Sequence, residues 1–239
     1  FYAIVDSGKV AKQSERPYSL RDYNRLIVYV LLVLLQVPFT IAIALQFRAH
    51  VLEAFVCPTR SMEPSIQIGD RFLVNKTTYA SRSPERGEIV VFNSPENRRR
   101  RWVKRVIAIP GDTIAVQGGE VLVNGEPLAR EVLGDSREEL DGFVSSGQVA
   151  WETNGNGRYA VQLGVKEQEP AEVEETRVPP GMIFVLGDNR DMSKDSRHVG
   201  LISEADVVGE AQFLYWPAQN WSRFGAMKWA VEERAFRGD

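Results

Sequence analysis

Ser61 and Lys104 are the residues of this chain whose types are best suited to nucleophilic catalysis. A serine hydroxyl becomes a nucleophile when a base removes its proton, and a lysine amine can be that base when burial lowers its pKa. Lys104 lies in the apolar run 102–109, where strand alternation places it among hydrophobic side chains. Burial would give a Ser-Lys pair, whereas an edge strand would leave the lysine in solvent, and the spacing alone keeps both interpretations open.

The two histidines are weaker candidates for the base. His50 closely follows a long apolar segment, and His198 lies in what the sequence indicates is a loop, with no fixed relation to Ser61. A Ser-His-Asp triad is therefore the less favoured interpretation. The single cysteine, Cys57, excludes an intramolecular disulfide and forms no metal-ligand cluster with the distant histidines, so we expect neither a metal nor a cofactor.

The composition is that of a folded protein of one or two domains. The chain has 239 residues, of which 44% are hydrophobic and 26% charged. Because 29 basic residues stand against 32 acidic ones, for a net charge of -3, we expect no nucleic-acid partner. Four arginines at 98–101 are interpreted as a charged hairpin tip, with contact to anionic lipid as a second interpretation and a phosphate site as the least favoured.

Residues 26–45 form an uncharged apolar segment that predicts a transmembrane helix. Twenty residues at 1.5 Å per residue span about 30 Å, the thickness of the hydrocarbon core of a bilayer. A buried core helix is usually shorter and keeps a polar face, and the segment exceeds the apolar region of a cleaved signal peptide. Since the chain begins at Phe1 instead of methionine, we expect it to be a fragment or a trimmed chain.

The basic residues on either side of this segment predict its orientation. More of them precede the helix than follow it within twenty residues: Lys9, Lys12, Arg16, Arg21 and Arg25 come before, and Arg48 and Arg60 come after. By the positive-inside rule, residues 1–25 lie in the cytoplasm and the roughly 190 residues after the helix lie outside it.

The remaining chain has the short apolar runs and turn residues of antiparallel strands. Candidate strands are 71–74, 88–92, 102–109, 112–116, 120–123, 157–163, 182–186 and 211–216, and Asn124-Gly125 predicts a tight hairpin turn. We therefore predict a mainly β protein: an antiparallel sheet or barrel formed by 46–117 and 177–217, and a smaller β subdomain or insertion at 118–176. Residues 218–239 are expected to be a polar tail, in which Trp221 and Trp229 are candidates for contact with the membrane interface.

Five ordered blocks of this sequence resemble the bacterial type I signal peptidases, also called leader peptidases. The blocks are 58–65 (PTRSMEPS), 69–76 (GDRFLVNK), 86–92 (RGEIVVF), 102–107 (WVKRVI) followed by 110–112 (PGD), and 187–197 (GDNRDMSKDSR). Five blocks in the expected order are hard to obtain by chance, and they extend over most of the region from Val51 to Pro217.

The resemblance implies a membrane-anchored, mostly β endopeptidase that removes signal peptides with a Ser-Lys dyad. It makes Ser61 the nucleophile and Lys104 the general base, and it places Thr59 with the Ser61 backbone N–H in the oxyanion hole. Ser193, Asp195 and Arg197 align with a serine that orients the lysine and with a supporting ion pair. The implied partners are preproteins with small residues before the cut, the phospholipid bilayer and the secretion translocon, at the bacterial cytoplasmic membrane.

Three positions depart from the usual family pattern, and none of them removes a reacting group. Ser65 stands where threonine is usual, Trp102 where tyrosine is common, and Met192 where asparagine is common. Organellar and conjugation-system peptidases with a Ser-Lys dyad are close alternatives. Self-cleaving repressors are disfavoured by the segment 26–45, and a catalytically silent, membrane-tethered β-domain that binds exported peptides is disfavoured by the presence of both Ser61 and Lys104.

Overall fold

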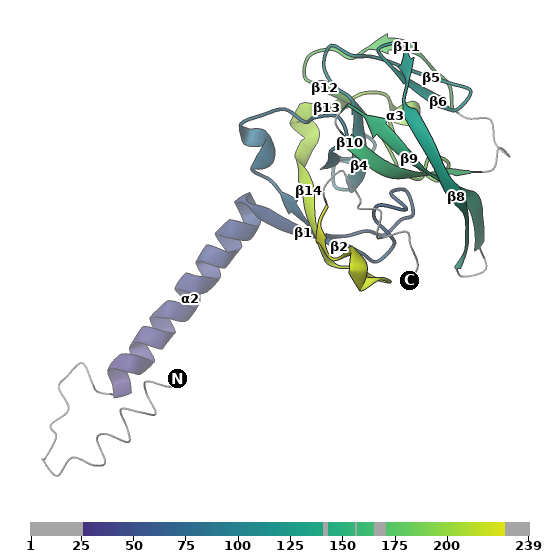
Figure 1. Cartoon of the computed structure of the whole chain (residues 1–239). Coiled ribbons are helices and arrows are strands. Elements are labelled where there is room, and N and C mark those ends of the chain that lie inside the picture. The colour runs from purple at the N-terminus through teal and green to yellow at the C-terminus, as the bar shows by residue number, and fades with distance from the viewer. Residues whose placement is uncertain (1–25, 141–142, 156, 165–170, 228–239) are drawn as a thin grey trace, which may run out of the picture. The chain divides into compact units, whose positions relative to one another are not determined.

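The computed structural model describes residues 26–140, 143–155, 157–164 and 171–227. Within 135–146 it describes the backbone alone. The chain divides between Arg48 and Ala49 into two compact units, a helical one and a larger β one (Figure 1). The predicted cytoplasmic segment 1–25 and Trp229 lie outside the described residues.

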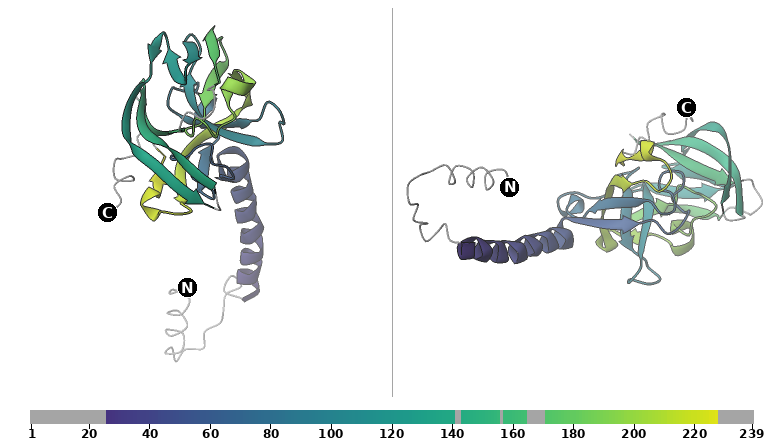
Figure 2. Two further views of the ribbon diagram at one scale, coloured as in Figure 1. Left: turned by 90° about the vertical axis from the view of Figure 1, so that its right-hand side faces the viewer. Right: turned by 90° about the horizontal axis from the view of Figure 1, so that it is seen from below.

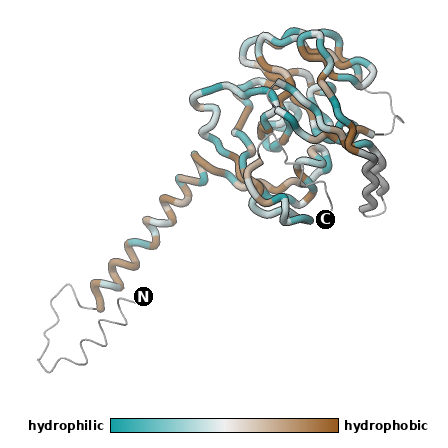
Figure 3. Tube along the Cα trace, in the orientation of Figure 1, coloured by the Kyte–Doolittle hydropathy of each residue, from teal (hydrophilic) through white to brown (hydrophobic). Residues whose placement is uncertain are grey.

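Helix α2, Leu26–His50, is the apolar element that the sequence predicts. None of its residues is buried, and its length and hydropathy are sufficient to cross a membrane. Figure 3 shows it as a mostly hydrophobic rod. The helix continues five residues past the predicted end at Leu45, because the polar residues that follow end the apolar run without breaking helical geometry. Thr40, near the internal Pro38, donates its hydroxyl to the Gln36 carbonyl at 2.9 Å.

The larger unit contains an antiparallel sheet formed by many of the short apolar runs of the sequence. Its strand order is β1-β2-β14-β3-β4-β12-β13, and β15 pairs with β14. The strands are β1 Leu52–Val56, β2 Arg71–Asn75, β3 Ile89–Asn93, β4 Arg101–Ala108, β12 Met182–Leu186, β13 Ile202–Ser203, β14 Val207–Trp216 and β15 Gly225–Ala226. Strand β4 therefore lies inside the sheet, between β3 and β12, rather than at an edge.

Two smaller antiparallel sheets lie in the middle of the sequence. One has the order β11-β5-β6-β7 and the other the order β10-β9-β8. Their strands are β5 Thr113–Gln117, β6 Glu120–Val123, β7 Glu126–Pro127, β8 Ala129–Leu140, β9 Phe143–Asn154, β10 Gly157–Gly164 and β11 Val173–Arg177. The pair β8 and β9 forms the long hairpin visible in both views of Figure 2. The predicted turn at Asn124-Gly125 is confirmed, since both residues have positive φ and join β6 to β7.

Short helical turns complete the unit, and two of them correct the sequence interpretation. They are α3 Ser196–Val199, η2 Thr78–Ala80, η3 Glu204–Asp206 and η4 Trp221–Arg223. His198 lies in α3 and not in a loop. Within the predicted polar tail, η4 and β15 are ordered, because Arg223 forms an ion pair of 2.7 Å with the buried Asp70 and β15 adds to the edge of the sheet along β14.

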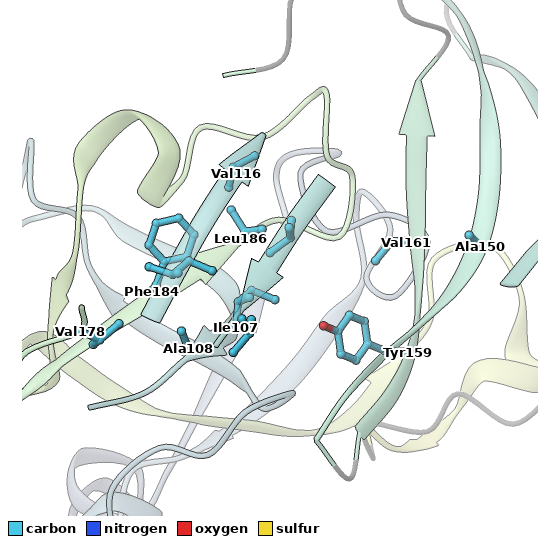
Figure 4. Packing of buried hydrophobic residues seen from close by; sticks show 12 residues of the cluster. Ile107, Ala108, Val116, Ala150, Tyr159, Val161, Val178, Phe184 and Leu186 are labelled. Atoms are coloured by element: carbon cyan, nitrogen blue, oxygen red, sulfur yellow. The ribbon is translucent and has the colours of Figure 1, made fainter. Parts of the chain in front are cut away.

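Buried side chains connect the small sheets to the large one. Ile107 of β4, Phe184 of β12, Val116 of β5 and Tyr159 of β10 belong to a single hydrophobic cluster. Figure 4 shows Tyr159 pointing toward Ile107 from a separate strand. The segment 118–176, whose division from the rest stays a prediction, thus shares a core with the strands that flank it.

Candidate active site

Ser61 is held in a compact turn between β1 and β2. The two ends of this segment are joined by backbone hydrogen bonds, from the Cys57 N–H to the Asp70 carbonyl at 2.9 Å and from the Gly69 N–H to the Cys57 carbonyl at 2.8 Å. Met62 and Ile66 are fully buried in a cluster with side chains of β2, β3 and β14. Because its neighbours are fixed in the core, Ser61 has a defined position, with 7% of its surface exposed.

Lys104 reaches Ser61 from the middle of β4. The lysine is paired with Val90 of β3, and only 4% of its surface is exposed. Its Nζ donates to the Ser61 Oγ at 2.7 Å. The interpretation in which this lysine extends into solvent from an edge strand is therefore wrong, because β3 and β12 cover both sides of β4.

Burial gives Lys104 the acid-base property that the chemistry requires. Removal from water lowers its pKa from the ordinary value of 10.5 to about 8. The nearby Asp195 and Asp188 carboxylates act in the opposite direction, since they stabilise the charged amine, while Arg197 lowers the pKa further. At pH 7, Lys104 is then neutral and able to accept a proton in roughly one molecule in ten.

Thr59 places a second hydroxyl beside that of Ser61. Its Oγ1 lies 3.2 Å from the Ser61 Oγ, and its side chain is exposed to solvent. The Ser61 backbone N–H has no acceptor among the residues that the structure describes. Hydrogen bonds from these two donors would stabilise an oxygen that becomes negative during attack on a carbonyl.

The segment 187–197 contacts the backbone of Ser61. The Asn189 N–H donates to the Ser61 carbonyl at 3.2 Å, and the Gly187 N–H donates to the Asp195 Oδ2 at 3.0 Å. Asp195 also caps α3 and forms an ion pair of 2.8 Å with Arg197. Burial alone would raise the pKa of Asp195, but the hydrogen bonds and charge of Arg197 lower it, so this residue stays a carboxylate near Lys104.

Ser193 lies in the same segment but is not bonded to the lysine. Its hydroxyl is buried, and its interaction with the Asp195 carboxylate helps to lower the pKa of that residue. The side chain packs against Gly187, where an added Cβ would collide with Ser193 and with the Ser61 carbonyl oxygen. Glycine at 187 is thus required for the close approach of the two segments.

Two charged residues of the site, Arg105 and Asp188, were not identified from the sequence. The Arg105 Nη2 lies 2.6 Å from the Asp188 Oδ2, and both side chains are 1% exposed. Arg105 also donates to the Gly87 carbonyl at 2.6 Å and to the Ser65 hydroxyl at 3.1 Å. An arginine in an apolar strand run was the available signal, because such a residue is buried only with a partner.

His198 is not the base that contacts Ser61. The side chain of His198 is 44% exposed, and its Nδ1 lies 3.9 Å from the Asp195 Oδ1. The contact with Ser61 is made by Lys104 instead. Across the described ranges, no group of three or more His, Cys, Asp and Glu side chains is placed to hold a metal ion.

Comparisons with known proteins identify relatives over most of the chain. Residues 29–216 match the family model described as "Signal peptidase, peptidase S26". Signal peptidase I of Bacillus caldolyticus is 34% identical over 178 residues, which cover 74% of this chain and 86% of that protein. Signal peptidase I of Pseudomonas aeruginosa is 31% identical over 219 residues, covering 77% and 75% of the two chains. A solved structure of a signal peptidase I from Enterococcus faecalis is 30% identical, covers 54% of this chain and 97% of its own, and superposes with a TM-score of 0.33.

Proposed function

We propose, from the premise that the chain belongs to the signal peptidase family, peptidase S26, that Ser61 and Lys104 are its catalytic pair. The family match and the relatives make the chain a serine endopeptidase that cleaves signal peptides. The observation that carries the assignment of the residues is the 2.7 Å hydrogen bond between the Lys104 Nζ and the Ser61 Oγ.

The reaction begins when Lys104 is neutral. Its amine accepts the hydroxyl proton of Ser61 while the Ser61 Oγ forms a bond to the scissile carbonyl carbon. The carbonyl π electrons move to oxygen, and the resulting oxyanion accepts hydrogen bonds from the Ser61 N–H and the Thr59 hydroxyl. Because the pKa of Lys104 is about 8, both the neutral and the protonated amine are accessible near neutral pH, so the lysine can accept a proton and later donate it.

The tetrahedral intermediate then breaks the peptide C–N bond. The protonated Lys104 returns its proton to the leaving amine, and the signal peptide remains attached to Ser61 as an ester. A water molecule next attacks this ester while Lys104 accepts one of its protons. Transfer of that proton to the Ser61 oxygen releases the carboxylic acid product and restores the starting hydroxyl.

Asp195, Arg197 and Ser193 are positioning residues in this proposal. Asp195 accepts a hydrogen bond from the Gly187 N–H and forms an ion pair with Arg197, and these contacts fix the segment next to Ser61. The charges of Asp195 and Arg197 also act on the pKa of Lys104. For Ser193 we keep the role that the family resemblance implies, a hydrogen bond that orients Lys104. The support for it is the buried position of Ser193 in the segment that contacts the Ser61 backbone.

The apolar α2 helix and the family indicate a protein anchored in a membrane. We further propose that this membrane is the bacterial cytoplasmic membrane, with the N-terminal segment in the cytoplasm and the β unit outside. The substrates would be preproteins with small residues before the cut, delivered by the translocon and cleaved at the surface of the bilayer. Protease added to spheroplasts should digest the β unit if this orientation is correct and should leave it intact if it is reversed.

The catalytic assignment is tested with the full chain in detergent and a preprotein that carries an Ala-x-Ala site. Ser61→Ala and Lys104→Ala should each abolish cleavage, and Lys104→Arg should also fail because guanidinium does not lose its proton in proteins. Ser222→Ala and Lys76→Ala are the matched controls and should cleave normally, because the described contacts of these residues are with Asn220, Ala49 and Glu53 and not with the catalytic pair. Cleavage by a folded Ser61→Ala or Lys104→Ala protein would overturn the assignment.

A further inference from the structure

Glu152 of β9 is a buried carboxylate outside the catalytic pair. Its side chain is fully inaccessible to solvent and accepts hydrogen bonds from three residues. Arg190 donates to both carboxylate oxygens, at 2.9 Å for its Nη1, while the Arg130 Nε and the Tyr159 hydroxyl each donate at 2.9 Å. Burial alone would raise the pKa of Glu152, but the two arginines lower it to about 2, so it is ionised at neutral pH.

Stability alone does not distinguish this cluster from an apolar one. Taking charges out of water is costly, and a buried ion pair often contributes no more than well-packed hydrophobic side chains of similar volume. What distinguishes the cluster is the place of Arg190. This residue lies in the segment 187–197, whereas Glu152 belongs to the long hairpin of the small sheet.

Arg190 connects Glu152 to the segment that contacts the nucleophile. Its Nε donates to the Gly187 carbonyl at 3.2 Å, and its own carbonyl accepts from Arg197 at 2.5 Å. The next residue toward the N-terminus, Asn189, donates its backbone N–H to the Ser61 carbonyl at 3.2 Å. The guanidinium held by Glu152 is therefore one residue away from a direct contact with the backbone of Ser61.

Backbone contacts from β10 hold the same segment in parallel. The Gln162 N–H donates to the Asp188 carbonyl at 2.8 Å, and the Arg190 N–H donates to the Gln162 carbonyl at 2.9 Å. These two bonds fix the direction of the chain but leave rotation of the side chain free. The Glu152–Arg190 pair adds a restraint on the Gly187 carbonyl, which lies in the chain between the Gly187 N–H that donates to Asp195 and the Asn189 N–H that donates to Ser61.

We infer that Glu152 is a positioning residue for catalysis, which acts by fixing Arg190 and, through residues 187–190, the Ser61 backbone. The inference rests on the proposed role of Ser61 and Lys104. It gives the hairpin β8–β9 a function in the reaction: this hairpin supplies a distant carboxylate that orients the segment next to the nucleophile.

The test compares variants that remove different hydrogen bonds of the Glu152 carboxylate. Glu152→Gln and Arg190→Lys both break the paired hydrogen bonds, while Arg130→Gln removes an arginine that bonds Glu152 without touching the segment 187–190. Each full-length protein is purified in detergent, its melting temperature is measured, and kcat and KM are determined on a preprotein well below that temperature. Arg190→Lys keeps a positive charge opposite Glu152, so it still tests the inference if Glu152→Gln folds poorly.

Displacement of the nucleophile should lower kcat about 10- to 100-fold in Glu152→Gln and Arg190→Lys with KM unchanged, because the substrate contacts remain while the reacting atoms are misplaced. Arg130→Gln should lower the melting temperature and leave kcat unchanged. A wild-type kcat in folded Arg190→Lys would overturn this inference and leave the catalytic assignment standing. A loss of kcat in Arg130→Gln as large as in Arg190→Lys would do the same. Cleavage by Ser61→Ala would instead overturn the catalytic assignment, and this inference with it.

Discussion

The Lys104 Nζ donates a hydrogen bond of 2.7 Å to the Ser61 Oγ across 43 positions of the sequence. Both side chains are almost fully buried, so water does not compete strongly for the contact. The sheet order explains how they meet, because the turn that carries Ser61 packs through Met62 and Ile66 on β2, β14 and β3, and β3 is paired with β4. The proposed nucleophile and the proposed base are thus brought together by the core and not by local sequence.

The first prediction concerns the pH dependence of cleavage. The base must be neutral, and burial moves the pKa of Lys104 down to about 8. We expect kcat/KM, which reports the free enzyme, to rise about tenfold per pH unit below that value and to level off above it. Initial rates on a preprotein between pH 6 and pH 10 measure this directly. A profile that is flat from pH 6, or that rises only near pH 10.5, would contradict the role of a buried lysine.

The second prediction concerns stability and follows from the same shift. Between pH 8 and 10.5 the unfolded chain binds more protons at residue 104 than the folded chain does, so wild-type stability rises with pH in that window. Below pH 8 the folded state bears the full cost, of about 3 kcal/mol at 1.36 kcal/mol per pKa unit. Lys104→Met should therefore unfold at higher temperature than wild type at pH 7, and the difference should shrink toward pH 10.5. A difference that does not change with pH would show that the lysine is not destabilised by burial.

The third prediction concerns the second hydroxyl at the nucleophile. Thr59→Val keeps the shape of the side chain and removes the proposed oxyanion donor, and loss of one such donor costs about 2.7–4 kcal/mol in comparable sites. We expect kcat to fall by about 10²- to 10³-fold with little change in KM. Thr59→Ser keeps the hydroxyl and is the matched control, which should retain most of the activity. Equal losses in the two variants would indicate a packing role for the threonine methyl instead.

Most strands could be predicted because their apolar residues alternate or cluster. Strands β3 and β12 are short runs of Val, Ile and Phe, and both lie at the predicted positions. Strands β1 and β9 were missed, as were β8 and β11. The sequences of β8 and β11 are rich in charges, and the described β11 residues are largely exposed. Their backbone hydrogen bonds depend on neighbouring strands, and no apolar face marks them in the sequence.

The site divides in the same way between local and long-range information. Residue type and the family blocks were sufficient to name Ser61, Lys104 and Thr59, whose contacts the structure describes. The spacing could not identify the pairs Arg105–Asp188 and Arg190–Glu152, which join positions 83 and 38 residues apart. A sequence pattern shows that a charge lies in an apolar run, but it does not show which distant charge neutralises it.

The fourth prediction concerns the buried pair formed by Arg105 and Asp188. Asp188→Asn would leave the Arg105 guanidinium in the core without a counter-charge, and breaking such a pair typically costs about 3–5 kcal/mol. The exposed pair of Arg158 and Glu131 offers the matched control, because Glu131→Gln makes the same change of carboxylate to amide at a pair worth about 1 kcal/mol or less.

Thermal and denaturant unfolding of the full chain in detergent compares these variants with a double one. In Arg105→Met combined with Asp188→Leu both charges are gone, so no buried charge is left unpaired and much of the lost stability should return. The Gly87 carbonyl and the Ser65 hydroxyl also lose their donor there, which keeps the recovery incomplete. If Asp188→Asn were no more destabilising than Glu131→Gln, the pair would not be holding β4 to the segment 187–197, and the placement of Lys104 beside Ser61 would need another support.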